Sequence, residues 1–424
     1  MNVSEGTWIG LLTALILFLL VTPLIARHLV RSSGDPAMFR ITMWGSGIKL
    51  AAAPAFLWVI AHFYGGIADS NGYFDQGARL AAQMRHGDFT LYAGKFIGDG
   101  ATRISAGFVE LAVGPHKLPT WFIFSFGAFV AEVMFYKAFE LAVPGGGRRR
   151  YAKLLFFFPS MVFWTAAPSK DCVTVLGLGL AAYGGAVLYD RRLRGFLWLG
   201  AGGALMTIIR PNVALIALLA LALPYPLGRV PARSVLTPVA AWVGGAIFIV
   251  GGVVLAGITA HHFDIHSLSR ASVEKVLKQN AYNTGTAAKN QLGAFNSSGA
   301  TSTSLSISAI PKDFYYVVMR PLPIHAHGFT QLASSLENVY LLGLLVTSWR
   351  RLGEVARTCL RRPYLLAALI FSLVWIVLFA SIGNLGILAR ERTQLIPFLL
   401  VLVSVKARRQ AASEPTPKQV LARA

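Results

Sequence analysis

Long apolar stretches separated by short arginine-rich loops are the feature that most constrains how this chain folds. A transmembrane helix needs about 20 predominantly apolar residues to cross a hydrocarbon core of about 30 Å. Several stretches, including those that begin at Trp8 and Pro119, approach or reach that length. Only 13% of the residues are charged, against roughly 25% in soluble domains. The sequence therefore predicts an all-α, polytopic integral membrane protein.

The basic residues lie mainly in the short loops, although the whole chain has a net charge of +21. Cytoplasmic loops of membrane proteins carry an excess of Lys and Arg, so these loops predict the topology. Since no basic stripe with interleaved aromatic residues lies on a polar domain, we predict no nucleic-acid partner. The pattern indicates about eleven spans in the plasma (inner) membrane, with the N-terminus outside and the C-terminus cytoplasmic: approximately residues 8–25, 49–64, 119–141, 151–167, 172–189, 196–209, 213–227, 235–259, 332–347, 364–382 and 387–405.

The first apolar stretch has neither a basic region before it nor a small-residue cleavage pattern after it, so we interpret it as a retained span. Residues 1–405 then form one polytopic membrane domain, and 406–424 form a short cytoplasmic tail. Large loops at about 65–117 and 260–328 are expected on the outer face. Cys172 and Cys359 fall on opposite sides in this topology, so we expect no disulfide between them.

The first outer loop is expected to carry helices that do not cross the membrane. Residues 72–82 have the amphipathic pattern of a helix lying along the interface. Residues 104–116 are apolar but too short to span, and counting them as a span would move Arg148 and its neighbours outside. We therefore expect a second interfacial or re-entrant helix there.

Charged residues from distant parts of the chain are predicted to meet at the outer ends of the spans. Ionisable groups near membrane depth are costly, so they are either paired or functional. Stretches far apart in the sequence deliver such groups to one membrane level, which is the main argument from the sequence for a site. The set is Asp69, Asp75, Arg79, Lys170, Asp171, Arg210, Arg390, Glu391 and Arg392.

Asp69 and Asp75 are the candidate catalytic residues. Asp69 directly precedes the predicted interfacial helix, where a carboxylate can accept a proton from an acceptor hydroxyl group. A helix-capping role is the alternative for Asp69, because Asp is also favoured at helix starts. Asp75 lies further along the same helix and has the same two interpretations.

Lys170, Asp171, Arg210, Arg390 and Arg392 are candidate substrate-binding residues. Lys170 is suited to a lipid phosphate as a point charge that Asp171 orients, and guanidinium groups bind phosphate in a bidentate manner. The alternatives are a snorkelling lysine with a capping aspartate, and an internal ion pair within Arg390-Glu391-Arg392.

The second outer loop offers weaker candidates. His325, where the chain returns to the membrane, is a candidate hydrogen-bonding group on the acceptor side. His261, His262, Asp264 and His266 have no recognised zinc spacing, so we expect a solvated loop and no metal site. Residues 283–308 are rich in Ser, Thr, Asn, Ala and Gly, and are expected to form a flexible loop or lid.

Four short motifs resemble segments of the GT-C superfamily of polytopic glycosyltransferases. Similarity is greatest to bacterial relatives of the protein mannosyltransferase and aminoarabinose transferase group. The motifs are Asp69-Ser70-Asn71-Gly72-Tyr73, the Phe-Pro-Ser-Met-Val-Phe-Trp block with Ser-Lys-Asp at 158–171, Arg210-Pro211-Asn212, and 386–392.

The resemblance implies a GT-C-like fold and inverting transfer of a sugar from a polyprenyl-phosphate donor on the extracytoplasmic face. The acceptor is a glycan, lipid or protein, and no cofactor is implied. By this resemblance Asp69 is the catalytic base, Lys170, Arg210 and Arg390 hold the donor phosphate, and Tyr73 belongs to the substrate-binding motif. The chain departs from the acidic pair of many members, because Ser70 follows Asp69.

Two other functions remain compatible with the sequence. A transporter or flippase of a lipid-linked or anionic solute would use the same outer cations as an entry site. Such a protein should also place polar groups along a path at mid-membrane, whereas this sequence concentrates them at one face. A non-catalytic subunit of an envelope-polysaccharide assembly complex is the other alternative.

Overall fold

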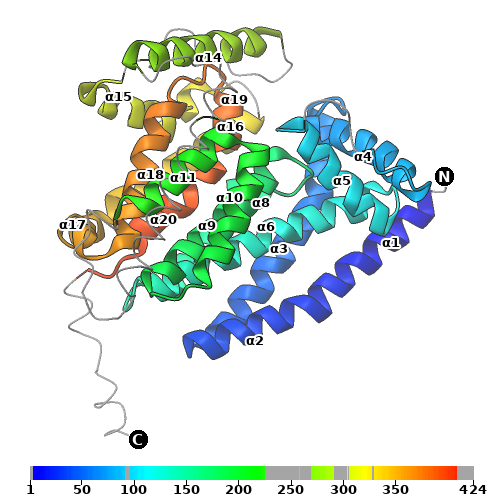
Figure 1. Cartoon of the computed structure of the whole chain (residues 1–424), viewed down its shortest axis with the longest axis horizontal. Helices are drawn as coiled ribbons and strands as arrows, with labels where there is room; N and C mark the ends of the chain where they lie inside the picture. The colour runs from blue at the N-terminus through cyan, green and yellow to red at the C-terminus, as the bar shows by residue number, and fades with distance from the viewer. Residues whose placement is uncertain are drawn as a thin grey trace, which may run out of the picture.

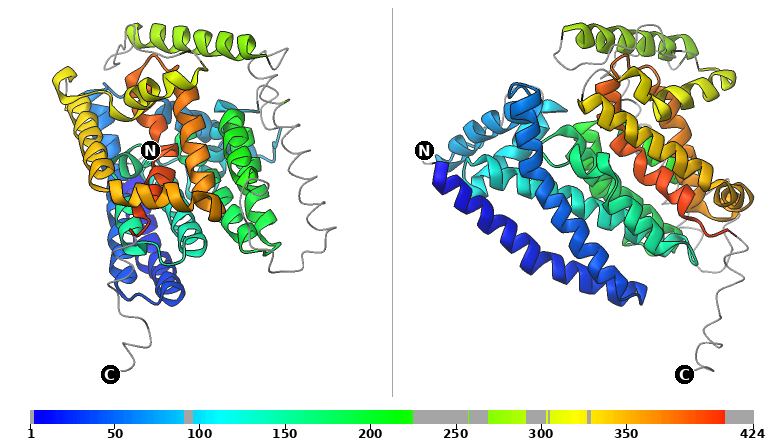
Figure 2. Two further views of the ribbon diagram at one scale, coloured as in Figure 1. Left: turned by 90° about the vertical axis from the view of Figure 1, so that its left-hand side faces the viewer. Right: turned by 180° about the vertical axis from the view of Figure 1, so that it is seen from behind.

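The computed structural model describes residues 3–90, 96–224, 269–290, 305–326 and 329–407, with the isolated positions 257 and 303. Within these ranges the regular elements are helices, with no strand (Figures 1 and 2). This agrees with the predicted all-α fold.

Long helices in the first half of the chain form the hydrophobic core together with helices of the second half. The first of these long helices is continuous through α1 (Val3–Ile16), a π-helical turn (Leu17–Val21) and α2 (Thr22–Ser33). It runs along the edge of the molecule (Figure 2). Small residues allow close packing: a Cβ atom added at Gly179 would lie 2.7 Å from the carbonyl oxygen of Ala131. The other long helices are α3 (Ala37–Phe63), α6 (Lys117–Ala142) and α9 (Lys170–Tyr189).

Four of the described helices are long and apolar enough to cross a membrane: Gly6–Ser33, Ala37–Phe63, Lys117–Ala142 and Lys170–Tyr189. A fifth span results if Trp349–Arg361 and Pro363–Phe379 are counted as one segment, which is bent by 112° between them. The structure thus fits a multi-pass membrane protein, whereas the predicted count of about eleven spans is not confirmed. Apart from position 257, the predicted span at 235–259 lies outside the described residues.

The remaining predicted spans correspond to shorter or broken helices. Helix α10 (Gly195–Ile209) has 15 residues and α11 (Pro211–Ala222) has 12. With a rise of 1.5 Å per residue, both are shorter than a hydrocarbon core of about 30 Å. Pro159 separates α7 (Arg148–Phe156) from α8 (Pro159–Phe163) within the predicted span 151–167, because proline disfavours helical backbone before it.

The rest of the chain follows the same pattern. Helix α16 (Phe329–Thr347) leads into α17 (Trp349–Thr358) and α18 (Pro363–Phe379). The predicted last span at 387–405 is divided into α19 (Leu385–Glu391), a 3₁₀ turn (Arg392–Gln394) and α20 (Ile396–Ser404). The remaining elements are α15 (Ile310–Phe314), a π-helical turn (Tyr315–Met319), and 3₁₀ turns at Ile307–Ala309, Pro323–His325 and Cys359–Arg361.

The first polar loop contains two helices that form a hairpin. Helix α4 (Asp69–Arg85) packs against α5 (Asp99–Val113), and both lie near the N-terminus (Figure 1). The buried residues of α4, among them Tyr73, Gly77 and Leu80, recur at the three- and four-residue spacing of one helix face. Residues 72–82 and 104–113 therefore lie in this hairpin, and their position at a membrane interface stays a prediction.

Part of the predicted lid is helical. Helix α14 (Arg270–Asn290) includes the beginning of the segment 283–308 and lies across one end of the molecule in each view of Figure 2. Asn280 donates a hydrogen bond to the Ser381 hydroxyl (3.0 Å), and the Gly383 amide donates to Thr284 (2.8 Å). Helix α14 thus contacts the loop that precedes α19. Residues 291–302 of the segment lie outside the described residues.

Several loops assigned to one side by their arginines meet at one end of the bundle. Arg149 pairs with Asp35, and Arg150 donates to the Ser348 hydroxyl (2.9 Å). Arg351 donates to the Val405 carbonyl (2.9 Å). The shared end agrees with the expected grouping of these loops, and the face of the membrane that it occupies stays a prediction.

An ion pair joins α3 and α6 in the interior. Lys49 Nζ lies 2.7 Å from Glu132 Oε1, and both side chains are fully buried. The same ammonium group donates to the Thr165 hydroxyl (2.6 Å) and to the Met161 carbonyl. Because Met161 and Thr165 belong to the segment around α8, Lys49 ties the broken helix to the two long ones.

Candidate functional site

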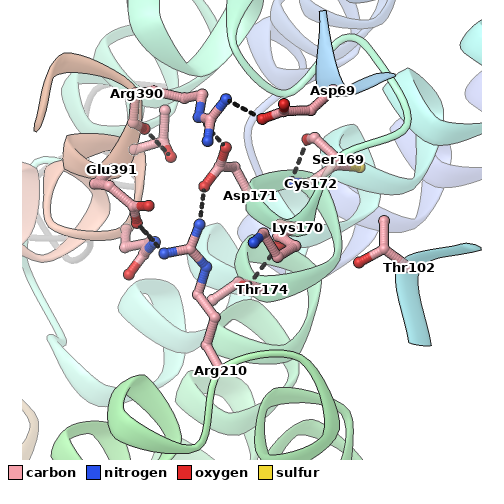
Figure 3. A network of polar contacts seen from close by, with 12 residues as sticks. Asp69, Thr102, Ser169, Lys170, Asp171, Cys172, Thr174, Arg210, Arg390 and Glu391 are labelled. Carbon is pink, nitrogen blue, oxygen red and sulfur yellow. Dashed lines mark hydrogen bonds and ion pairs between the residues drawn. The ribbon is translucent and has the colours of Figure 1, made fainter. Parts of the chain in front are cut away.

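A network of five charged side chains joins four segments of the chain (Figure 3). Arg210, between α10 and α11, donates to Asp171 Oδ1 (2.8 Å) and to Glu391. Arg390 Nε lies 2.8 Å from Asp171 Oδ2, and Arg390 Nη1 donates to Asp69 Oδ2 (3.2 Å). Asp171 therefore bridges two guanidinium groups, and Arg390 bridges two carboxylates. The structure brings together Asp69, Asp171, Arg210 and Arg390, as the sequence predicts.

Helix starts position Asp171 and Asp69. The Ser169 hydroxyl accepts a hydrogen bond from the Cys172 amide (3.1 Å), which caps α9 and puts Asp171 in its first turn. A carboxylate is favoured there by the helix dipole. Asp69 is the first residue of α4, after the N-cap Ala68. Its carboxylate lies toward Arg390 (Figure 3), so its observed partner is the arginine.

The two arginines are positioned by helix ends. The Asn384 side chain caps α19 by accepting from the amides of Gly386 (2.9 Å) and Ile387 (3.3 Å). This seven-residue helix then places Arg390 and Glu391 in its last turn. Arg210 precedes Pro211, which starts α11 at a position where proline is favoured. The Arg-Pro junction thus holds Arg210 between two helices.

The network has a buried centre and an exposed edge. The side chains of Asp171 and Glu391 are 1% and 5% exposed, whereas that of Asp69 is 63% exposed. Arg390 joins the two zones with a 28% exposed side chain. The buried carboxylates fix the arginines, and the exposed edge leaves Asp69 accessible to a molecule from solution.

Lys170 lies at the exposed edge, where it pairs with Asp99, a residue that the sequence did not predict for the site. Its ammonium group lies 3.0 Å from Asp99 Oδ1, and the Tyr73 hydroxyl donates to the same oxygen. Asp99 starts α5, so it holds Lys170 and Tyr73 near the start of α9. The available signal was the Gly-Asp-Gly sequence at 98–100, an acidic residue before the apolar stretch that predicted α5.

The contacts of Asp99 change its own acidity and that of Tyr73. Partial burial raises the pKa of Asp99, but hydrogen bonds from Tyr73 and Lys170 outweigh it, so this pKa is lowered overall. Burial and then the hydrogen bond to Asp99 raise the pKa of Tyr73 above its ordinary value. Asp99 is therefore a carboxylate and Tyr73 a neutral phenol at neutral pH.

Asp75 lies outside the network. It is exposed on α4 and acts electrostatically on Glu110 of α5. Glu110 is fully buried, and neither of its carboxyl oxygens has a hydrogen-bond partner among the described residues. Burial, followed by the charge of Asp75, raises the pKa of Glu110 to about 8. Arg85 donates to the Glu110 carbonyl (2.6 Å).

Arg392 and His325 are also not part of the network. Arg392 is buried, and it donates to the Asn338 side chain and to the Val318 carbonyl (3.4 Å). Its contacts join the turn after α19 to α16 and to the segment before Arg320, which is a packing role. His325 ends a 3₁₀ turn, and its side chain lies outside the described part of the structure. Residues 261–266 lie outside it as well.

A cavity of about 350 Å³ opens where α7 and α8 meet α16. Its lining is mostly apolar and includes Phe157, Phe158, Leu336 and Tyr340. Lys153 and Glu337 add charged groups, and Glu337 accepts hydrogen bonds from the amide (2.7 Å) and hydroxyl of Ser160. An apolar chain fits this lining chemically.

Comparison with protein families, curated proteins and solved structures found no match.

The chemistry available at the network follows from its residue types. Three cations, Lys170, Arg210 and Arg390, lie around carboxylates at one site. Guanidinium groups stabilise phosphate oxygens and other oxyanions, and an exposed carboxylate such as Asp69 is able to accept a proton. Within the described ranges, no group of three or more His, Cys, Asp and Glu residues is arranged to hold a metal ion.

Proposed function

We propose that this chain is a membrane glycosyltransferase that moves a sugar from a polyprenyl-phosphate donor to an acceptor hydroxyl on the extracytoplasmic face. The acceptor is a glycan, a lipid or a protein. The proposal places the charge network at the outer ends of the helices. It also assigns the chain a GT-C-like architecture, with the N-terminus outside and the C-terminus in the cytoplasm.

One observation carries the proposal: an exposed carboxylate lies beside a cluster of phosphate-binding cations drawn from distant segments. Asp69 is 321 positions from its partner Arg390, and Asp171 is 39 positions from Arg210. A helix-end ion pair does not require so many segments to converge. Transfer from a lipid phosphate requires a base for the acceptor and cations for the leaving phosphate, and both are present here.

The proposed reaction is a single displacement. The acceptor oxygen forms a bond to the anomeric carbon while the bond from that carbon to the phosphate oxygen breaks. Asp69 takes the proton of the acceptor hydroxyl, and the electron pair of the broken bond leaves with the lipid phosphate. Lys170, Arg210 and Arg390 meet the charge that develops on this phosphate. One displacement inverts the anomeric configuration.

The apolar cavity beside α16 is consistent with a lipid-borne substrate. Its aromatic and aliphatic lining suits hydrocarbon, and Lys153 and Tyr340 add polar atoms to this lining. We assign no step of the reaction to this cavity, because the charge network alone supplies the reacting groups.

The test is a transfer assay with purified protein in lipid nanodiscs. Polyprenyl phosphates carrying different radiolabelled sugars are supplied with membrane extracts as the acceptor source. We expect transfer by the wild type from one donor class, and a loss of about 10²–10⁴-fold in Asp69→Asn, which removes the base. Polyprenyl phosphate should still bind to Asp69→Asn.

The proposal would be overturned if the wild type bound lipid phosphate through Arg210 but transferred sugar from none of the donors. That result favours a transporter or a non-catalytic subunit. A vesicle flux assay with the same lipids separates these two alternatives, because only the transporter moves the substrate across the bilayer.

A further inference from the structure

Each of the three cations at the site is already paired with a carboxylate of the chain. Arg210 holds Asp171 and Glu391, Arg390 holds Asp171 and Asp69, and Lys170 holds Asp99. These pairs contain four carboxylates and three cations. An anionic phosphate group that entered this arrangement would therefore add to an existing excess of negative charge, and at least one carboxylate has to be displaced.

The carboxylates are not equally easy to displace. Asp171 and Glu391 are buried, and breaking a buried pair by removing one partner is strongly destabilising. Asp69 and Asp99 are 63% and 52% exposed, and exposed ion pairs contribute little to stability. Incoming phosphate should therefore replace the exposed carboxylates and leave the buried ones in position.

Asp69 is also the proposed base, so its displacement from Arg390 affects its ability to accept a proton. Its Oδ2 atom accepts from Arg390 Nη1 at 3.2 Å (Figure 3). While this contact persists, the oxygen nearest the cations is engaged and the position that a phosphate would occupy is filled. When phosphate pairs with Arg390 instead, the Asp69 carboxylate becomes available to an acceptor hydroxyl.

We propose that Arg390 is a positioning residue that exchanges Asp69 for the donor phosphate, so that donor binding releases the catalytic base. This inference rests on the proposed function and adds a compulsory order, in which the lipid phosphate binds before the acceptor. The ligand class is a phosphate monoester or diester with an exposed anionic oxygen. Arg390 itself forms and breaks no covalent bond.

The test measures competition between Asp69 and phosphate. A short-chain polyprenyl phosphate is titrated into full-length protein in nanodiscs. We expect Asp69→Asn to bind it up to about five-fold more tightly than the wild type, because the exposed pair no longer competes. In an Arg390→Gln background, the same change should give no gain. Asp69 is exposed, so Asp69→Asn should fold.

Asp75→Asn is the matched control for net charge. It removes the same charge from the same helix, but Asp75 lies toward Glu110 of α5. A gain that is equal in Asp69→Asn and Asp75→Asn would overturn the inference, since it would reflect general electrostatics alone. Unchanged or weaker binding by Asp69→Asn would overturn it as well. Inorganic phosphate, titrated in parallel, shows whether the gain needs the lipid chain.

Failure of this inference is distinguishable from failure of the proposed function. If the wild type transfers sugar but Asp69→Asn does not bind polyprenyl phosphate more tightly, the proposed function stands and the exchange at Arg390 is excluded. If Asp69→Asn binds polyprenyl phosphate more tightly but the wild type transfers no sugar, the exchange at Arg390 stands and the enzyme assignment is excluded. In an active enzyme, polyprenyl phosphate should inhibit competitively against the donor and non-competitively against the acceptor. Uncompetitive inhibition against the acceptor would exclude the compulsory order, because it would mean that the acceptor binds first.

Discussion

Two ionic clusters in this molecule contain the same kinds of side chain but differ in enclosure. Lys49 and Glu132 lie between α3 and α6 with no exposed side-chain surface. The network around Asp171 has an equally buried centre, but it continues through Arg390 to Asp69, which is 63% exposed. Only the second cluster offers a path on which a ligand can exchange with a partner.

The difference separates a structural role from a binding role. Every cation of both clusters is paired, so pairing does not distinguish them. The ammonium group of Lys49 is additionally held by Thr165 and by the Met161 carbonyl, which leaves no side open to solvent. We therefore interpret the Lys49 cluster as a structural link to the broken helix around α8.

The largest expected effect is on the enclosed cluster. Lys49→Met or Glu132→Leu alone should lower the free energy of unfolding by about 3–5 kcal/mol, because each leaves an unpaired buried charge. The double variant should recover much of this loss. Denaturant titration in mixed micelles measures all three variants. Additive losses would contradict a closed pair and would point to separate roles for the two groups.

Glu110 is an intermediate case, a buried carboxyl group that forms no ion pair with the side chains that the structure describes. Its pKa of about 8 lies above the ordinary 4.5, so the folded state keeps a proton that the unfolded state has already lost. Stability should therefore fall between about pH 4.5 and 8, by at most about 1.4 kcal/mol per pH unit. Glu110→Gln should flatten this fall, as measured by thermal unfolding from pH 5 to 9.

A fall in stability that is as steep in Glu110→Gln as in the wild type would show that another group is responsible. Asp75→Asn sharpens the test, because the charge of Asp75 contributes to raising the pKa of Glu110. In that variant the pKa of folded Glu110 should be lower, so the fall in stability should end at a lower pH.

Arg210 tests the open cluster. We expect Arg210→Ala to weaken binding of polyprenyl phosphate by about 10–100-fold, since hydrogen bonds to charged groups contribute about 1.5–3 kcal/mol. Arg210→Lys should retain part of the affinity, because it keeps the charge without the two-pronged geometry. Isothermal titration in nanodiscs measures both. Equal affinity in all three proteins would remove Arg210 from the phosphate site.

The smallest effect is expected at an exposed pair remote from the network. Arg149 pairs with Asp35, and the arginine side chain is 63% exposed. Arg149→Ala should change the free energy of unfolding by less than about 1 kcal/mol and leave lipid-phosphate affinity unchanged. A loss of affinity in this variant would indicate that basic charge in general, rather than the network, attracts the lipid.

The sequence predicted the members of the network better than their partners. Charges at helix ends predicted that Asp69, Asp171, Arg210 and Arg390 meet, because helix termini share a level in a bundle. The sequence did not predict that Asp99 belongs to the site, because its role depends on how α5 folds back beside α9. It also placed Asp75 and Arg392 in the site, since one-dimensional spacing does not show that Asp75 faces α5 or that Arg392 turns toward Asn338.

The fold was predictable to a similar degree. Apolar length and arginine position predicted the long helices α3, α6 and α9. The same reasoning assigned full spans to 151–167 and 387–405, where the structure has breaks after Phe156 and Glu391. Proline and the cost of unpaired backbone groups act locally, and tertiary contacts such as those of Lys49 compensate for such breaks. Hydropathy averaged over a window does not detect them.

Photocrosslinking tests most directly whether the open network binds the lipid phosphate. A polyprenyl phosphate with a photoreactive group next to the phosphate is bound to the wild-type protein, irradiated and mapped by mass spectrometry. Our account predicts labels on peptides that contain Asp69, Lys170, Arg210 or Arg390, and their loss when unlabelled lipid competes. Labels confined to the arginine-rich end around Arg149 and Arg351 would contradict it.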